Sequence, residues 1–223
     1  YNPGGSVNTA TLLGSMVTGQ FNGEVFTKLI YNENLQNNNT DYNYTNNLDG
    51  VTLNSLDLDK VYVLTTSSSA SASELIINSL RPYIDVVHIG ETTKGKSQAS
   101  ITIYDSPTFV TKANINPNHS YAMQPLVAIT YNKNDVSVPS SGLIPNITLS
   151  EGDYVYNLEL FGNIDEPFLA AAIDDILGTG RYSQAYGDSL ITLHKIESKN
   201  ETFDEMYIEE EIAAIISETE LFN

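Results

Sequence analysis

Cysteine and tryptophan are absent from this 223-residue chain, and only three histidines are present. Without cysteine, the chain can form neither disulfides nor thiolate metal sites. No spacing of histidine, aspartate and glutamate is typical of metal ligands, so we expect no bound metal. The sequence also has no apolar run long enough to span a bilayer and no signal-peptide pattern at its start.

Basic residues are scarce as well. Ten lysines and arginines stand against 28 acidic residues, which gives a formal net charge of −18. Such a charge argues against a nucleic acid or an anionic membrane surface as a partner. Because 41% of the residues are hydrophobic, the chain can bury a sizeable core, with room for one large domain and an appendage.

The middle of the chain predicts a strand-helix-strand unit. The apolar run over residues 61–64 indicates a buried strand, the small residues 65–73 a turn, and residues 74–80 a helix that ends before Pro82. A second apolar run over residues 86–89 indicates another strand. In such a unit the two strands are parallel neighbours joined by a right-handed crossover.

This topology can bring together two reactive side chains that lie 25 positions apart, Ser71 and Lys96. Both strands end at the same edge of the sheet, about 4.8 Å apart. Residues just beyond each strand can therefore converge. The pattern allows a serine-lysine dyad.

Four motifs carry a family resemblance. They are S-A-S-A-S-E at 69–74, G-E-T-T-K-G-K at 90–96, N-P-G-G at 2–5 and G-L-I-P-N at 142–146. In this order and separation they resemble the S41 serine peptidases, the tail-specific or carboxyl-terminal processing proteases. The resemblance extends from residue 1 to about residue 178.

The resemblance implies a set of roles. Ser71 is the nucleophile, Lys96 is the general base, and the oxyanion hole consists of the amides of Ala72 and a glycine of the Gly4-Gly5 pair. It implies a polypeptide substrate and neither a metal nor an organic cofactor. It also implies an α/β domain of the crotonase/ClpP-like superhelical kind, built from layered βαβ units.

The chain departs from the family pattern near the lysine. Lys94 stands where an aromatic residue is usual, and Ser100 stands where many members have glutamine, with Gln98 nearby. Some members have an aspartate at the position of Pro82, and Asp85 is the nearest acid here. We therefore predict the dyad and leave a third catalytic residue open.

The proposed chemistry explains the residue types. A serine hydroxyl is a poor nucleophile at neutral pH, and a lysine can accept its proton only when the amine is uncharged. Burial favours the neutral amine, and so would a second cation such as Lys94 if it approached Lys96. The helix that begins near Ser73 would direct its amides and positive dipole end at the developing oxyanion.

Flanking segments suggest further elements. Residues 9–17 have the apolar spacing of a helix, and residues 26–31 that of a short strand. Residues 32–47 are rich in asparagine and favour a polar, solvated loop. As an alternative, Tyr42 and Tyr44 could line a substrate groove.

The second half of the domain continues the pattern. Residues 100–104 alternate like a strand, and residues 121–131 indicate a strand interrupted by Pro125, which suggests an edge or a bend. Residues 166–173 predict a helix with proline in its first turn, closed by Gly178. We interpret the three histidines, His88, His119 and His194, as structural.

Residues 1–178 are thus expected to be the C-terminal part of a peptidase domain, and residues 179–223 an acidic appendage. Within the appendage, residues 189–196 suggest a strand. A capping-box pattern at Thr202 predicts an amphipathic terminal helix that carries Met206. We expect this helix to pack on its own domain rather than on a partner.

The chain starts at Tyr1 without the apolar strand that precedes the glycine loop in the family. We expect an upstream portion, which in relatives includes a PDZ-like domain, and either a companion fragment or a homo-oligomer that covers the open sheet edge. The family suggests an extracytoplasmic location in a bacterial cell envelope, with membrane attachment only through an anchor outside this chain.

The functional prediction is a serine endopeptidase that cleaves polypeptides near their C-termini through an acyl-enzyme. Two alternatives stay open. One is a peptide- or ligand-binding module that keeps the fold without turnover. The other is acyl transfer on a thioester, which uses oxyanion amides but needs no serine-lysine pair.

Overall fold

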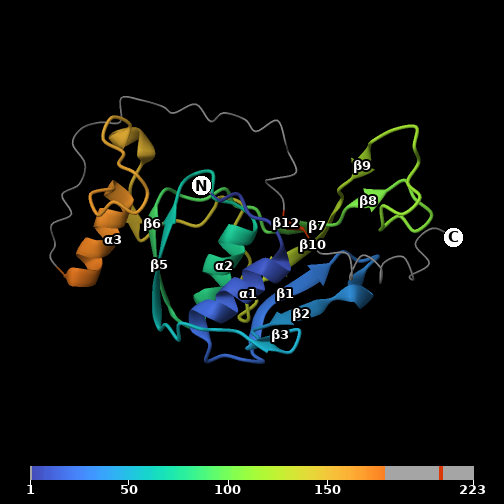
Figure 1. The fold of residues 1–223 in the computed structure, drawn as a ribbon, viewed down its shortest axis with the longest axis horizontal. Coiled ribbons are helices and arrows are strands. Elements are labelled where there is room, and N and C mark those ends of the chain that lie inside the picture. Colours follow the sequence, from blue (N-terminus) through green and yellow to red (C-terminus); the bar gives the residue numbers. More distant parts are fainter. Residues whose placement is uncertain (1, 179–205, 208–223) are drawn as a thin grey trace.

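The computed structural model describes residues 2–178 and 206–207. Two sheets enclose two helices, and a third helix covers the outer face of the smaller sheet (Figure 1). The helices are α1 (Val7–Thr18), α2 (Ala72–Leu80) and α3 (Pro167–Leu177). Two short 3-10 helices, η1 (Gln36–Asn38) and η2 (Glu151–Tyr154), lie in connecting segments.

The larger sheet has five strands in the order β12-β7-β10-β1-β2, with the bounds Met206–Tyr207, Gln98–Ser100, Leu126–Tyr131, Val25–Tyr31 and Thr40–Asn43. The smaller sheet is parallel and has the order β11-β6-β5, with the bounds Ile147–Thr148, Asp85–Gly90 and Lys60–Thr65. Two hairpin-like pairs complete the described part, β3 (Asn47–Leu48) with β4 (Val51–Thr52), and β8 (Ile103–Tyr104) with β9 (Ala122–Met123).

The main core lies where α1 and α2 face the sheets. Phe26 and Leu29 of β1 and Leu75 and Ile77 of α2 are at most 1% exposed. Burial of each such side chain contributes about 1.5–3 kcal/mol. Gly14 allows α1 to approach β1 closely, because a Cβ there would lie 2.5 Å from the Phe26 ring.

The predicted strand-helix-strand unit is confirmed. β5 and β6 are parallel and in register, with Val61 opposite Val86 and Thr65 opposite Gly90. α2 connects them and begins at Ala72, two residues before the predicted start. Both strands therefore end at one edge of the sheet, and the motifs that follow them share that edge.

The segment over residues 32–47 corrects a prediction. It contains η1 and β2, and β2 pairs with β1 along the sheet edge. Tyr44 is 2% exposed and packs its ring edge-on against Phe26 and Tyr83, while Tyr42 packs against the same core. The interpretation of Tyr44 as a groove residue was wrong, because its large apolar ring fills the core between α2 and β1.

Two strand predictions also change. The expected strand over residues 100–104 is divided into β7 and β8. The expected strand over residues 121–131 is divided at Pro125 into β9 and β10, and β10 is an interior strand between β7 and β1. Met206 lies in β12, parallel to β7, rather than in a helix. Its side chain is 1% exposed, so insertion into the core outweighs the helical pattern. The other elements predicted for residues 179–223 lie outside the described residues.

Helix α3 is confirmed at both ends. Pro167 occupies its first turn, the Glu166 carboxylate accepts hydrogen bonds from the first helical amides, and Gly178 ends it in the left-handed conformation. Phe168 packs with Ile89 against the outer face of the parallel sheet. This second small core is separate from the one around α2.

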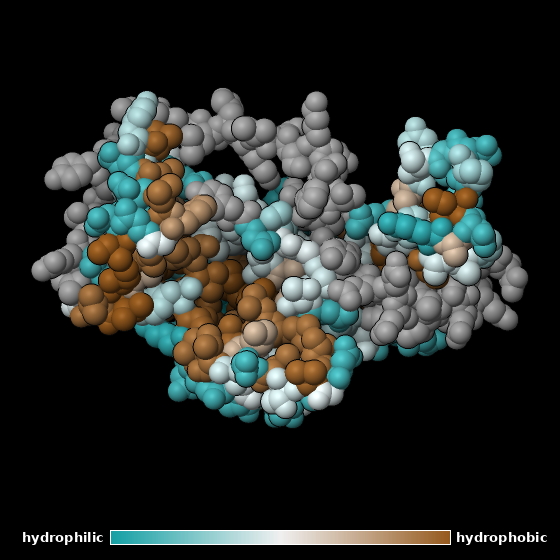
Figure 2. All heavy atoms as spheres, viewed as in Figure 1, coloured by the Kyte–Doolittle hydropathy of each residue, from teal (hydrophilic) through white to brown (hydrophobic). Residues whose placement is uncertain are grey.

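The surface differs from one side of the molecule to the other. Figure 2 shows brown, apolar atoms over α1 and on the side of α3, whereas the projecting β8–β9 region is mainly teal and white. Exposed apolar side chains of the molecule include Leu13, Met16, Leu64, Phe161 and Ile176. Across residues 2–178 and 206–207, no helix is long and apolar enough to cross a membrane, and no group of histidines and carboxylates could hold a metal ion.

Candidate active site

Ser71 stands at the turn between β5 and α2 in a backbone conformation that serine rarely adopts. Its φ and ψ are 61° and −122°, and its side chain is fully buried. A non-glycine residue held at positive φ stores strain of about 1–3 kcal/mol, and such strain is typical of a nucleophile on a sharp strand-to-helix turn. The turn holds the Ser71 hydroxyl at the edge where the parallel strands end.

Glu74 is the central group of the site, and the sequence prediction did not include it. Its fully buried carboxylate accepts hydrogen bonds from the backbone amides of Ser71 (2.8 Å), Gly95 (2.7 Å) and Lys96 (2.9 Å), and from the Thr93 hydroxyl. One carboxylate therefore joins the turn that carries the serine to the loop that carries the lysine. The available signal was the Ser-x-x-Glu spacing of a capping box.

The loop after β6 is pressed against the serine turn. The Lys94 amide donates to the Ser69 carbonyl at 3.0 Å, and Lys96 is half-buried. Gly95 has φ +87°, and a Cβ there would lie 2.4 Å from the Ser140 carbonyl oxygen. Only glycine satisfies both the positive φ and this close approach.

The G-L-I-P-N motif supports the same loop from its other side. The Thr93 amide donates to the Leu143 carbonyl at 3.2 Å, and the Leu143 amide donates to the Thr93 hydroxyl at 2.8 Å. The same hydroxyl donates to Glu74. This motif therefore reaches the site through a chain of hydrogen bonds rather than by direct contact with Ser71.

The N-P-G-G motif lies directly over the serine. A Cβ on Gly4 would lie 2.6 Å from the Ser71 Cβ and 2.8 Å from the Ala72 nitrogen. The Gly4 amide already donates to the Asn2 side chain at 2.9 Å. Of the two glycines, Gly5 is thus the better second donor to pair with Ala72 in an oxyanion hole.

The predicted bond within the dyad is not formed in this structure. The Ser71 hydroxyl has no hydrogen-bond partner, so it does not bond to the Lys96 amine. In enzymes without substrate such bonds are often long and tighten only in the complex. The backbone brings the two residues to one place, and direct contact between their side chains stays a prediction.

The residues considered as a third catalytic group have other positions. Asp85 begins β6 at the far end from Gly90 and lies 3.6 Å from the Lys60 amine. The Ser100 hydroxyl donates to the Met206 carbonyl, and Gln98 is an exposed residue of β7. None of these observations identifies an assistant for Lys96.

His88 lies within β6 just behind the site. Its ring is fully buried, its Nε2 bonds to the Thr65 hydroxyl, and its Nδ1 has no partner. Burial, together with the charge of Arg81, lowers the pKa of His88 to about 4. A neutral ring inside a strand agrees with its interpretation as a structural residue.

Comparisons with known proteins identify the same family that the sequence motifs resemble. The model of peptidase family S41 matches residues 1–147. Among solved structures, a candidate S41 protease from Bacteroides fragilis is 29% identical, with a TM-score of 0.70, and the match covers 80% of this chain and 43% of that one. No curated protein matches the chain.

Two further solved structures show weaker similarity. The photosystem II D1 C-terminal processing protease is 18% identical with a TM-score of 0.44, over 66% of this chain and 32% of that one. A lipoprotein from Streptococcus agalactiae is 12% identical with a TM-score of 0.43, over 61% and 43%. The chain thus spans less than half the length of each of these structures.

The mixed α/β fold is therefore one that S41 peptidase domains share. The finer description as a crotonase/ClpP-like superhelix stays a prediction.

Proposed function

This chain belongs to peptidase family S41, and on that premise we propose that it is a serine endopeptidase that cleaves polypeptides near their C-termini. The observation that carries the proposal is the Glu74 carboxylate, which binds the amides of Ser71 and Lys96 at once. This arrangement supports a nucleophile and a base held on adjoining turns. A serine in a positive-φ turn under a glycine loop supports the same reading.

The proposed reaction begins with attack of the Ser71 Oγ on the peptide carbonyl carbon, while the neutral Lys96 amine takes the hydroxyl proton. Lys96 then returns that proton to the leaving amine as the C–N bond breaks. An acyl-enzyme on Ser71 remains. Lys96 next deprotonates a water molecule, whose attack on the ester releases the new carboxylate and restores the hydroxyl.

Charge on the tetrahedral intermediate needs donors that are free at the moment of reaction. The Ala72 amide begins α2, where the first amides have no partner within the helix and the dipole favours negative charge. The Gly5 amide is its proposed companion. Loss of one such donor lowers turnover by about 100- to 1,000-fold.

The setting of the enzyme is also a proposal. We infer action in a bacterial cell envelope, on unfolded polypeptide, with an upstream portion or a second copy completing the substrate channel. The high negative charge supports a polypeptide rather than a nucleic-acid substrate.

One experiment tests the mechanism. Unfolded polypeptide labelled at its C-terminus is incubated with the full-length protein and with its Ser71→Ala and Lys96→Ala variants, and fragments are identified by mass spectrometry. We expect cleavage by the parent and background rates in both variants. Ser73→Ala is the matched control, because Ser73 lies two residues further on, in the first turn of α2, with a half-buried side chain, and should keep activity. Cleavage that persists in both site variants would remove the mechanism.

A binding module without turnover is the second candidate, favoured by the absent hydrogen bond at the Ser71 hydroxyl. Binding of the same polypeptide, with no fragment from the parent protein, would support it. Transfer of an acyl group from a thioester that tolerates Ser71→Ala would support the third possibility.

A further inference from the structure

The segment that follows β7 lines a pocket of its own. Residues 102–124, here called the β8–β9 lobe, project from the larger sheet (Figure 1). Residues of this lobe line a pocket of about 690 Å³ that is open to solvent. No role in the serine-lysine chemistry falls to these residues.

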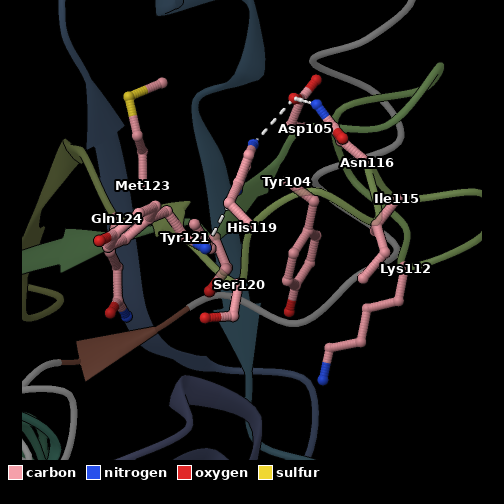
Figure 3. A pocket seen from close by; sticks show the side chains of 12 residues that line it. Tyr104, Asp105, Lys112, Ile115, Asn116, His119, Ser120, Tyr121, Met123 and Gln124 are labelled. Atoms are coloured by element: carbon pink, nitrogen blue, oxygen red, sulfur yellow. Dashed lines mark hydrogen bonds and ion pairs between the residues drawn. The ribbon is translucent and has the colours of Figure 1, made fainter.

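The pocket combines apolar walls with one cation. Tyr104, Ile115 and Tyr121 contribute apolar surface, and Figure 3 shows the Lys112 side chain extending beside the Tyr104 ring. The Lys112 amine lies 5.6 Å from the centre of that ring. Such a placement orients the ammonium group without neutralising it.

Lys112 differs from three other lysines of this acidic chain in its surroundings. Lys28, Lys60 and Lys133 each lie within 4 Å of a carboxylate, whereas no carboxylate of the described residues pairs with Lys112. The nearby acid, Asp105, is already held by Asn116 at 2.9 Å and by His119 at 3.1 Å (Figure 3). These hydrogen bonds lower the pKa of the Asp105 carboxyl. The cation in the pocket is therefore available to an anionic ligand.

The lobe also offers backbone groups to an extended chain. β8 and β9 form a two-stranded sheet, so each has an outer edge that no strand of the described residues covers. Tyr121 and Met123 on this hairpin are 83% and 66% exposed. An extended peptide can add to such an edge through main-chain hydrogen bonds, while pockets select its side chains.

The position of the lobe along the chain limits the distance between Lys96 and the pocket wall. Thr102, at the pocket wall, follows Lys96 by six residues. Six residues span at most about 20 Å even when fully extended. A polypeptide held at Ser71 can therefore enter the pocket with a residue about six positions from the cleaved bond.

We propose that the β8–β9 lobe binds the C-terminal end of the substrate polypeptide, with its terminal carboxylate on Lys112 and an apolar terminal side chain between Tyr104 and Tyr121. This inference rests on the proposed function, since it names the part of the substrate that lies beyond the cleaved bond. The lobe then favours release of a short C-terminal fragment, whose length depends on the distance between Ser71 and Lys112.

The test uses the Ser71→Ala protein, which keeps the pocket while cleavage is blocked. The probe is a labelled peptide of about ten residues that ends in leucine, either with a free carboxylate or with a C-terminal amide, and binding is followed by fluorescence anisotropy. We expect amidation to weaken binding about tenfold, the size of one charge-assisted contact. Lys112→Met should weaken binding of the free-carboxylate peptide by the same factor and leave binding of the amide peptide unchanged.

Lys60→Met is the matched control, because Lys60 also lies over a tyrosine ring, 4.9 Å from the centre of Tyr62, but in another part of the molecule. It should bind both peptides as the parent does. Equal binding of the two peptides by the parent, or equal losses in both lysine variants, would overturn the inference. An amide-ended peptide with one internal glutamate that binds as tightly as the free carboxylate would also overturn it.

The two proposals fail separately. Discrimination between the peptides without any cleavage by the unmodified protein would count against the protease and leave the lobe standing. If the protein cleaves polypeptide, but neither amidation of the substrate nor Lys112→Met changes the products, the result would count against the role of the lobe and leave the protease proposal standing.

Discussion

Two regions of this molecule lie six residues apart along the chain and differ in almost every physical respect. The Glu74 cluster, which consists of Glu74 and its donors Ser71, Thr93, Gly95 and Lys96, surrounds a carboxylate with no exposed surface. The β8–β9 lobe places its polar contacts in solvent and leaves Tyr121 largely exposed.

This difference suits the two regions to different tasks. Buried, fully bonded polar groups hold a geometry to fractions of an ångström, which a reaction needs, but they cannot adapt to different partners. Exposed aromatic residues beside a two-stranded sheet can accept varied polypeptides while few internal hydrogen bonds are lost. The cluster is therefore suited to chemistry and the lobe to recognition.

The largest expected effect comes from Glu74→Gln. An amide nitrogen cannot accept hydrogen bonds, so at least one of the amides of Ser71, Gly95 and Lys96 would remain buried without a partner. We expect the free energy of unfolding to fall by about 2–5 kcal/mol and kcat/KM for polypeptide cleavage to fall by at least about 100-fold. Denaturant unfolding and the fragment assay measure the two. Unchanged cleavage would show that the cluster does not position the dyad.

A second prediction concerns His88, which is buried behind the cluster, whereas His119 of the lobe is exposed. The pKa of His88 is about 4 in the folded protein, against an ordinary value of 6.5. Below pH 6.5 the His88 ring binds a proton in the unfolded state but not in the folded state. The free energy of unfolding therefore falls by about 3 kcal/mol as the pH drops from 6.5 to about 4.

Unfolding of the parent and of His88→Gln, measured at several pH values, isolates this contribution. The difference between the two proteins should be constant above pH 7 and should change through the acidic range. A constant difference down to pH 4 would mean that His88 titrates normally.

Gly4→Ala tests how closely the glycine loop covers Ser71. The added methyl group would lie 2.6 Å from the Ser71 Cβ at φ +120°, so the loop must move. Because the loop carries the proposed oxyanion donor, turnover should fall by about 100-fold. Gly23→Ala is the control, since Gly23 also has positive φ, at +87°, but a Cβ there meets nothing within 4 Å. Equal activity of the two variants would contradict the proposed oxyanion hole.

The smallest effect is expected in the lobe. Asp105→Asn is the counterpart of Glu74→Gln, a carboxylate changed to an amide, but Asp105 is exposed and water can replace its contacts with Asn116 and His119. The melting temperature should stay close to that of the parent. A loss of stability as large as that of Glu74→Gln would contradict the proposed difference between the two regions.

Local patterns predicted most of the fold near the site. Continuous apolar runs indicated β5 and β6, and a proline in the first turn with a closing glycine indicated α3. The sequence did not reveal β2 or the placement of Met206 in β12. Both depend on distant partners, β1 and β7, that no local pattern specifies.

The site was predictable in part. Ser71, Lys96 and the glycine motifs follow from sequence order and resemblance, whereas the prediction gave Glu74 no role in the site. Its role depends on two amides more than 20 positions away, those of Gly95 and Lys96, which only the folded chain brings to it. Contact between the Ser71 and Lys96 side chains is not visible in either the sequence or the fold.

The most direct measurement is therefore the covalent intermediate itself. The full-length protein is mixed with a nitrophenyl ester of a short peptide, quenched in acid and mapped by mass spectrometry. The account predicts an acyl group on Ser71, absent from Ser71→Ala and formed at least about 100-fold more slowly in Lys96→Ala. An acyl group on another residue, or equal rates with and without the Lys96 amine, would contradict it.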